Sequence, residues 1–303
     1  MSGNLPLVSI VTPSYNQGRF IEDTILSVKN QDYPNIEHIV VDGGSNDDTL
    51  EILRKYEDEY NLKWISEPDE GQSDAVNKGF RMAEGEIIGW LNSDDVYFTR
   101  DVISYVVGEF ERNLGADVVY GDGVIIGESG LILRVTKMSQ WVWNYKLLLL
   151  GYPPAQPSLF FRNEVITNNK IEDDLDYAMD FEFWLRLIQN GYNFHYVNKI
   201  LSGDRFHGIK KSVHNIDLLT IEKKKVLEEY GQKINFLFYI RYFVNRIKIS
   251  IFKRLLGCSD ILKIDENDLA FNAILPGKFS RIRNQLCLSK IVSGTISLIK
   301  GYL

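Results

Sequence analysis

The chain has 303 residues, of which 45% are hydrophobic and 25% are charged, and its net charge is −7. These values are ordinary for a globular protein, and they exclude a disordered chain, a collagen and a coiled-coil rod. Residues 1–230 hold 22 lysines and arginines against 37 acidic residues, and such an acidic body argues against nucleic acid as its ligand.

The first 121 residues alternate between strand-like and helix-like hydrophobic patterns. Such alternation predicts a mostly parallel sheet flanked by helices, which is the α/β fold class. We expect Ser45 or Asn46 to cap the second helix and Thr99 to cap the fourth. The predicted strands are 8–12, 36–41, 62–65, 86–91 and 118–120, and the predicted helices are 20–28, 50–56, 72–83 and 99–110.

The hydrophobic pattern of the sequence changes after about residue 121. Two short apolar runs separated by Gly127 and Gly130 predict a hairpin, and a further strand is expected over 158–161. Strong helical periodicity follows over 180–188, and a last helix is expected over 216–230. We therefore divide residues 1–230 into a first half, 1–121, and a second half, 122–230.

The C-terminal region 231–303 differs in charge, with 12 lysines and arginines against 4 acidic residues. Its aromatic and basic composition predicts a helical appendage. Two interpretations stay open: a cap or contact between copies of the chain, and an anchor on an anionic membrane surface. Cys258 and Cys287 form no disulfide framework, and the first residues resemble no secretory signal. We expect a cytoplasmic protein, with peripheral membrane contact through the tail.

Three polar clusters follow predicted strands, at 12–16, 42–45 and 92–95. Open parallel sheets bind ligands at the carboxyl ends of their strands, so these clusters are expected to line one crevice. Asp42 could accept an N–H of a nucleobase, or it could cap the following helix.

The third cluster, Asn92-Ser93-Asp94-Asp95, is the sharpest chemical signal. Adjacent carboxylates repel one another unless a cation or hydrogen-bond donors compensate. Oxygen ligands of this kind suit Mg²⁺ or Mn²⁺, which usually completes its shell with phosphate oxygens. The alternative is a helix-capping loop. The chain lacks the glycine-rich phosphate loops of dinucleotide dehydrogenases and P-loop enzymes.

The ordered motifs over about residues 7–215 resemble the family 2 glycosyltransferases. They read V-S-I-V-T-P-S-Y-N, V-V-D-G-G-S-N-D-D-T, D-E-G-Q-S-D-A-V-N-K-G and G-W-L-N-S-D-D. The resemblance implies a nucleotide-sugar-dependent enzyme with the GT-A fold over residues 1–230, in which the first half binds the donor and the second half binds the acceptor.

The resemblance also implies roles for individual residues on the donor side. Asp94 takes the place of the metal-binding acid of the D-x-D motif, and Asp95 would support it, either as a further metal ligand or from behind Asp94. Asn92 departs from the motif, because it stands where the family has the first acid. His207, in an R-x-H segment, would approach the metal or the diphosphate. The residues implied to hold the nucleoside diphosphate sugar are Pro13, Ser14, Tyr15, Asp42, Asp74, Asn92, Ser93 and Asp94.

Asp180 matches the catalytic base of the family, at the head of the helix M-D-F-E-F-W-L-R. Met179 replaces the usual preceding acid, and Glu182 is the alternative base. From the residues alone, Asp180 would be a first-turn acid that the helix dipole favours. With the resemblance, Asp180 is expected to remove a proton from the acceptor hydroxyl as it attacks the anomeric carbon, with inversion. Residues 156–162 resemble the strand that frames the acceptor side.

The function expected is transfer of a sugar from a nucleoside diphosphate sugar, with Mn²⁺ or Mg²⁺, to a saccharide or lipid-linked saccharide. Cell-surface polysaccharide or glycolipid assembly is the expected setting. Asp42 suits uracil or thymine, but guanine also offers an N–H edge. The alternatives are a nucleotide-sugar-binding partner subunit without turnover, favoured by Asn92 and Met179, and a nucleotidyltransferase.

Overall fold

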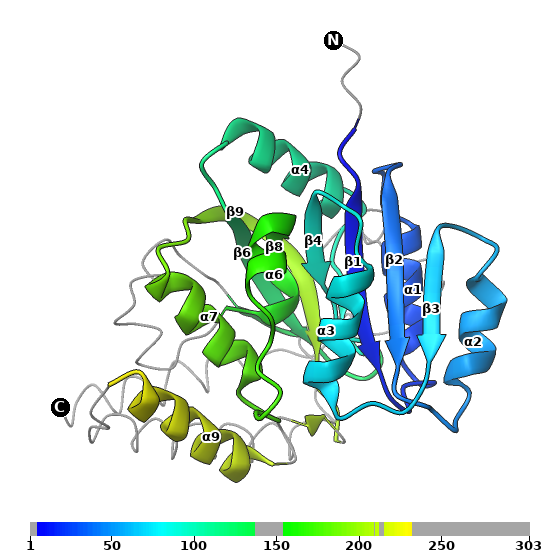
Figure 1. Ribbon diagram of the computed structural model, residues 1–303. Coiled ribbons are helices and arrows are strands. Elements are labelled where there is room, and N and C mark those ends of the chain that lie inside the picture. The colour runs from blue at the N-terminus through cyan, green and yellow to red at the C-terminus, as the bar shows by residue number, and fades with distance from the viewer. Residues whose placement is uncertain (1–4, 137–153, 209, 212–214, 232–303) are drawn as a thin grey trace, which may run out of the picture.

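A computed structural model describes residues 5–136, 154–208, 210–211 and 215–231 (Figure 1). Within these residues nine strands form one mixed sheet flanked by helices, so the predicted α/β class is confirmed. The strand order is β3-β2-β1-β4-β8-β6-β9-β5, with β7 paired to β6. The strands are β1 Val8–Ser14, β2 Ile36–Asp42, β3 Leu62–Ser66, β4 Ile87–Trp90, β5 Val96–Tyr97, β6 Val118–Ile126, β7 Ile132–Thr136, β8 Leu159–Arg162 and β9 Phe194–Arg205.

The first four strands of this order are parallel, whereas β8 runs antiparallel to both β4 and β6. The carboxyl ends of β1 to β4 therefore lie at one edge, which is the lower edge in Figure 1. The helices are α1 Ile21–Lys29, α2 Thr49–Tyr56, α3 Gln72–Met82, α4 Val102–Arg112, α6 Asn163–Asn168, α7 Met179–Gln189 and α9 Ile216–Glu229, with a short 3-10 turn, η1, over Gln156–Ser158.

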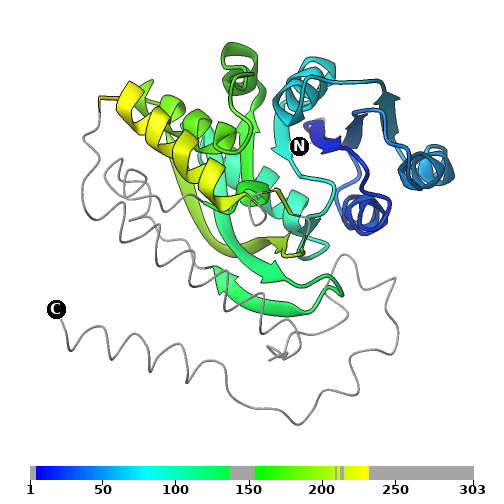
Figure 2. The ribbon, with the colours of Figure 1, turned by 90° about the horizontal axis from the view of Figure 1, so that it is seen from below.

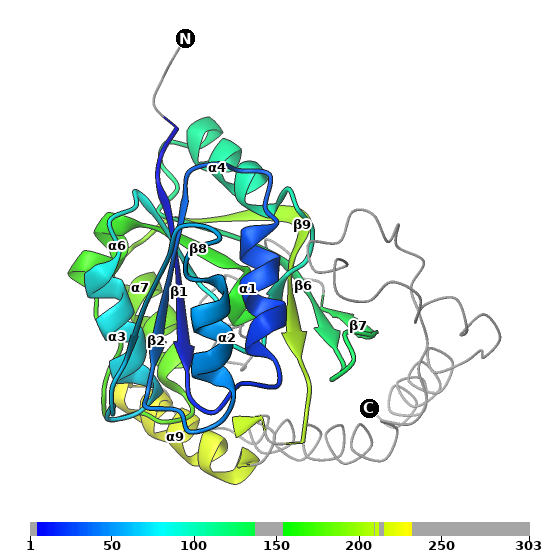
Figure 3. The ribbon, with the colours of Figure 1, turned by 90° about the vertical axis from the view of Figure 1, so that its right-hand side faces the viewer.

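Helices cover both faces of the sheet. Helices α1 and α2 lie on one face, and α3, α6 and α7 lie on the other (Figure 3). Seen from below, α9 runs beside α7 (Figure 2). Burying a large apolar side chain contributes about 1.5–3 kcal/mol, so the fully buried Trp90 and Trp184 are among the larger contributors to the core between sheet and helices.

Helix α3 lies close against β1 because residue 79 is glycine. A Cβ at Gly79 would lie 2.3 Å from Val11 Cγ1, closer than non-bonded carbon atoms can approach. This contact places the first turn of α3 at the carboxyl edge of the sheet.

Several predicted boundaries need correction. Neither Ser45 nor Asn46 caps α2, because Asp48 stands at that position, and the Ser45 hydroxyl donates to Asp42. Thr99 does not cap α4, which begins after Asp101. The strand predicted over 118–120 continues as β6 through the first strand of the hairpin.

The twelve-residue strand β9 is absent from our sequence predictions. Its apolar residues are interrupted by Asn198, Lys199 and Gly203, so it lacks a clear period of two. It forms because it pairs in parallel with β6, where Val118 faces Phe194.

None of the helices in the described ranges is long and apolar enough to cross a membrane. The helical appendage predicted over 231–303 lies outside the described residues, apart from Gly231.

Candidate active site

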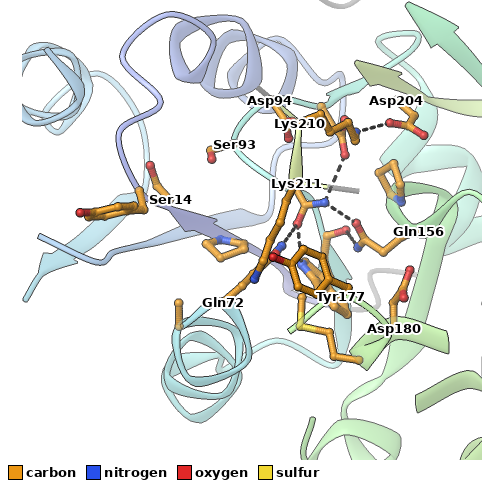
Figure 4. A pocket seen from close by; sticks show the side chains of 18 of the residues that line it. Ser14, Gln72, Ser93, Asp94, Gln156, Tyr177, Asp180, Asp204, Lys210 and Lys211 are labelled. Atoms are coloured by element: carbon orange, nitrogen blue, oxygen red, sulfur yellow. Dashed lines mark hydrogen bonds and ion pairs between the residues drawn. The ribbon is translucent and has the colours of Figure 1, made fainter. Parts of the chain in front are cut away.

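A cavity of about 600 Å³ lies at the carboxyl ends of β1 and β4, where the sequence predicts the ligand crevice (Figure 4). It lies between the first half of the chain and α7 and α9 of the second half. Gly71, at its rim, has φ +118°, which favours glycine, and it starts α3. The predicted site residues that line the cavity are Pro13, Ser14, Tyr15, Asn92, Ser93, Asp94, Asp95, Asp180 and His207.

Asp94 and His207 meet in this cavity although they are 113 residues apart. His207 Nε2 lies 2.8 Å from Asp94 Oδ2, and Asp94 is 9% exposed. Burial alone would raise the pKa of Asp94, but the nearby Lys210 ammonium and the His207 hydrogen bond hold that pKa below its ordinary value. Asp94 is therefore ionised at neutral pH and can bind a cation.

Asp95 lies next to Asp94 but faces the protein interior. Its Oδ1 accepts the backbone N–H of Arg205 at 2.9 Å, and the side chain is almost fully buried. Burial raises the pKa of Asp95 to about 8, although Lys210 opposes the shift. This position fits a supporting residue.

Lys210 places a positive charge beside both of these carboxyl groups. Its Nζ lies 3.5 Å from Asp95 Oδ1 and 3.9 Å from Asp94 Oδ2, and it also donates to Asp204 (Figure 4). Burial would lower the pKa of Lys210, but the three carboxylates raise it well above its ordinary value. Lys210 is therefore a fixed positive charge at the acidic end of the cavity.

The fully buried Arg205 anchors the loop that carries Asp94. Its Nε donates to the Asp94 carbonyl oxygen at 2.8 Å, and its Nη2 donates to Asp23 Oδ2 at 2.7 Å. Breaking a buried ion pair strongly destabilises the folded state. Arg205, the first residue of the R-x-H segment, therefore fixes the main chain beside the site.

Both the oxygen and the nitrogen of the Asn92 side-chain amide form hydrogen bonds. Its Oδ1 accepts from Trp90 Nε1 at 3.1 Å and from Gln72 Nε2 at 3.0 Å. Its Nδ2 donates to Gln156 Oε1 at 2.9 Å and to Asp95 Oδ2 at 3.3 Å. A carboxylate could not make the last two bonds as a donor, so the local network explains why asparagine stands here.

We expect Asn92→Asp to lower the free energy of unfolding by about 1–3 kcal/mol, because it removes a half-buried hydrogen-bond donor and adds a charge beside Asp95. Urea unfolding of the two proteins measures this change. Asn46→Asp, at an exposed position, is the control for the same chemical substitution. An Asn92→Asp protein as stable as the wild type would show that the amide donor is dispensable.

Two predicted donor-binding residues do not line the cavity. Asp42 is fully buried, and its carboxylate accepts hydrogen bonds from Ser45 and from Ser66 Oγ, the latter at 2.7 Å. Asp74 forms an ion pair with Lys78 at 3.1 Å. The interactions of Asp42 are those of a loop organiser, and its contact with a nucleobase stays a prediction.

Asp180, at the start of α7, lies across the cavity from Asp94 (Figure 4). Burial raises the pKa of Asp180, while the positive charge of Lys223 in α9 lowers it. The alternative base, Glu182, is held by Arg186 Nε at 2.8 Å and by Tyr230 Oη at 2.6 Å. Glu182 is not among the described residues that line the cavity, so Asp180 has the better position for a base.

Several cavity residues received no individual role from the sequence, among them Gln156, Lys210 and Lys223. Gln156 stands in a segment noted for the acceptor side, and Lys210 lies three residues after His207. The position of Lys223 depends on how α9 packs against α7, which no local pattern predicts.

Comparison with known proteins identifies the family of this chain. A model of glycosyl transferase family 2 matches residues 9–166. An uncharacterized glycosyltransferase of Mycobacterium tuberculosis is 41% identical over 184 residues, which cover 60% of this chain and 68% of the relative. Chondroitin synthase of Escherichia coli is 28% identical over 227 residues, which cover 74% of this chain and 32% of that protein. The chain thus spans about a third of the length of some curated relatives.

Solved structures share the fold at lower identity. S. aureus TarS 1–349 in complex with UDP-GlcNAc aligns with a TM-score of 0.57 and 20% identity, covering 74% of this chain and 71% of that chain. The mannosyltransferase PcManGT from Pyrobaculum calidifontis, in complex with GDP-Man and Mn²⁺, aligns with a TM-score of 0.59 and 16% identity, covering 97% and 81%. These likenesses agree with the GT-A fold, and the family match over more than half of the sequence shows that the chain belongs to glycosyl transferase family 2.

Proposed function

We propose that this protein transfers a sugar from a nucleoside diphosphate sugar to a hydroxyl group of a saccharide acceptor, with inversion at the anomeric carbon. The observation that carries the proposal is the cavity itself. One end holds the ionised Asp94 with His207, and the other end holds Asp180 (Figure 4). Displacement of a nucleoside diphosphate in one step requires a cation site and a base, and this cavity offers a candidate for each.

The residues at the Asp94 end fit a divalent metal ion. Asp94 and His207 offer a carboxylate oxygen and an imidazole nitrogen side by side, and both line the cavity. The described ranges contain no cluster of three or more potential protein ligands, so water and diphosphate oxygens would complete the shell. A bound Mn²⁺ or Mg²⁺ would supply charge neutralisation to the departing diphosphate, an effect worth several kcal/mol.

The donor would occupy the half of the cavity next to Ser14 and Ser93. Among the described side chains, Ser14 Oγ and His207 Nδ1 are buried without a hydrogen-bond partner. Buried polar atoms are normally paired, so both atoms are candidates to meet a ligand or water. Tyr15 is 58% exposed at the rim, where its ring can stack on a planar or sugar face.

The Asp180 carboxylate would act as the base. When it is ionised it can take the proton of the acceptor hydroxyl while the oxygen attacks the anomeric carbon. A single base and a direct displacement invert that carbon. The acceptor would enter beside Tyr177 and Lys211, which line the cavity, with Lys211 Nζ 5.0 Å from the centre of the Tyr177 ring.

The relatives support a proposal for the biological setting. Chondroitin synthases and a hyaluronan synthase are among the similar proteins, which supports a place in cell-surface polysaccharide or glycolipid assembly. We propose residues 1–230 as the catalytic domain, with the donor half over 1–121 and the acceptor half over 122–230. The basic region 231–303 would bring the enzyme to a cytoplasmic membrane surface that carries lipid-linked acceptors, or join copies of the chain.

A thermal-shift screen tests the donor site and identifies the nucleobase of the donor. We expect one of UDP, dTDP, GDP, ADP and CMP to raise the melting temperature, and to do so more strongly with Mn²⁺. A ligand at 100 times its dissociation constant adds about 2.7 kcal/mol to stability, which corresponds to roughly 5 °C. A protein whose melting temperature no nucleotide changes would contradict the proposal.

Product analysis then separates the alternatives. Sugar transfer releases a nucleoside diphosphate from the donor, whereas a nucleotidyltransferase acting on a sugar phosphate and a nucleoside triphosphate releases pyrophosphate. Binding of a donor without its consumption across many acceptors would instead favour a partner subunit.

A further inference from the structure

Helix α9 lies beyond the matched family region, which ends at residue 166. It runs beside α7 (Figure 2), and its residues 222 and 223 face the start of that helix. Asp180 is the second residue of α7. The start of α7 therefore decides where the carboxylate of the proposed base points.

The backbone before α7 is held by one side chain of α9. Glu222 Oε2 accepts the N–H of Tyr177 at 2.7 Å and the N–H of Ala178 at 2.9 Å, and Oε1 accepts the N–H of Asp176 at 3.2 Å. Three successive N–H groups thus converge on one carboxylate from 44 to 46 residues along the chain. Such convergence of backbone dipoles on an anion is a strong local restraint.

The first residues of α7 offer no equivalent restraint of their own. Ala178, at the N-cap position, has no polar side chain. Met179 stands where the resemblance places an acid, and its sulfur accepts a hydrogen bond from Ser73 Oγ at 2.9 Å. The Asp180 carboxylate accepts the N–H of Phe181 at 2.7 Å, a bond within the same turn.

We infer that Glu222 is a positioning residue for the transfer reaction: it fixes the start of α7 and so aims the Asp180 carboxylate at the acceptor hydroxyl. The inference rests on the proposed function, in which Asp180 is the base. Glu222 acts through the backbone of residues 176–178 and does not contact the donor end around Ser14 and Asp94. Its loss should change the chemical step and leave nucleotide binding unchanged.

The test compares Glu222→Ala and Glu222→Gln with Glu228→Ala, a control on the same helix whose side chain is 55% exposed. We expect Glu222→Ala to lower kcat at least about tenfold, since a misplacement near 1 Å can cost about 10²-fold. KM for the donor and the nucleotide-induced thermal shift should stay within about twofold of wild type. Glutamine keeps one acceptor oxygen, so Glu222→Gln should recover part of kcat. Glu228→Ala should behave as wild type.

A double variant tests whether Glu222 acts through Asp180. Asp180→Asn/Glu222→Ala should be no slower than Asp180→Asn, because a positioning residue has nothing left to aim. Additive losses, or a Glu222→Ala protein with wild-type kcat, would overturn the inference. If Asp180→Asn itself transferred sugar at the wild-type rate, Asp180 would not be the base, and the proposed function would be contradicted before the inference about Glu222. If Asp180→Asn were inactive and Glu222→Ala fully active, the inference about Glu222 alone would fail.

Discussion

Asp180→Asn is expected to lower kcat for sugar transfer by about 10²–10⁴-fold while KM for the donor stays nearly unchanged. Asparagine has almost the same shape but cannot accept the proton of the acceptor hydroxyl. The donor end of the cavity, around Asp94 and His207, is untouched by the change. Steady-state kinetics with a saturating acceptor and a varied donor measure this split between kcat and KM for the donor.

Asp174→Asn is the matched control, because Asp174 lies six residues earlier, is 67% exposed and pairs with Lys225 outside the cavity. We expect that variant to keep its activity. If Asp180→Asn retained a rate within a few fold of the wild type, another group would have to take the proton. Glu182 would then need to leave its bonds to Arg186 and Tyr230.

The pH dependence of kcat provides a second measurement on the same residue. Only ionised Asp180 can act as a base, so kcat should rise with pH through the pKa of this carboxyl group. Burial raises that pKa above the ordinary aspartate value, with partial opposition from Lys223. The acid limb of the profile should therefore lie at higher pH than for an exposed aspartate. An acid limb at or below the ordinary aspartate pKa would contradict a buried base.

Asp94→Ala should abolish the metal-dependent part of the nucleotide thermal shift and reduce transfer at least about 100-fold. The variant removes the ionised carboxylate beside His207, and several kcal/mol of stabilisation of the departing diphosphate go with the metal. Differential scanning fluorimetry with the nucleotide from the screen, with and without Mn²⁺, measures the first effect. Asp58→Ala, at an exposed position in the turn after α2, is the control.

An Asp94→Ala protein that kept its Mn²⁺-dependent shift would place the metal elsewhere in the chain. Loss of the shift with an unchanged transfer rate would instead mean that another cation stabilises the diphosphate. Lys210 is the nearest candidate, since its Nζ lies 3.9 Å from Asp94 Oδ2 and it lines the same cavity.

Local sequence patterns predicted most of the parallel half of the sheet. The strands β1 and β2 are rich in apolar residues because both of their faces are buried, and each ends in a polar residue at the carboxyl edge. Helix α7 was equally clear, since Phe183, Trp184 and Leu187 recur at helical spacing and all are fully buried. These signals lie within each segment, so they can be recognised without knowing which other segments pack against it.

The strand β9 and the N-termini of α2 and α4 could not be obtained in this way. A strand such as β9 forms through hydrogen bonds to β6, about 75 residues earlier, rather than through its own pattern. The choice between neighbouring polar residues as caps, such as Thr99 and Asp101, depends on small differences in backbone direction.

The sequence alone predicted the α/β class, the crevice at the carboxyl ends of the strands, and part of its lining, including Asp94, Asp180 and His207. These residues stand at the ends of locally readable elements or in ordered motifs, which is why they could be identified. The tertiary structure was needed to show that Asp42 is enclosed by Ser45 and Ser66, that Lys210 lies against Asp95 beside Asp94, and that Glu222 holds the start of α7. Hydrogen bonds and ion pairs between distant segments depend on positions in space to within about an ångström, and spacing along the chain does not contain that information.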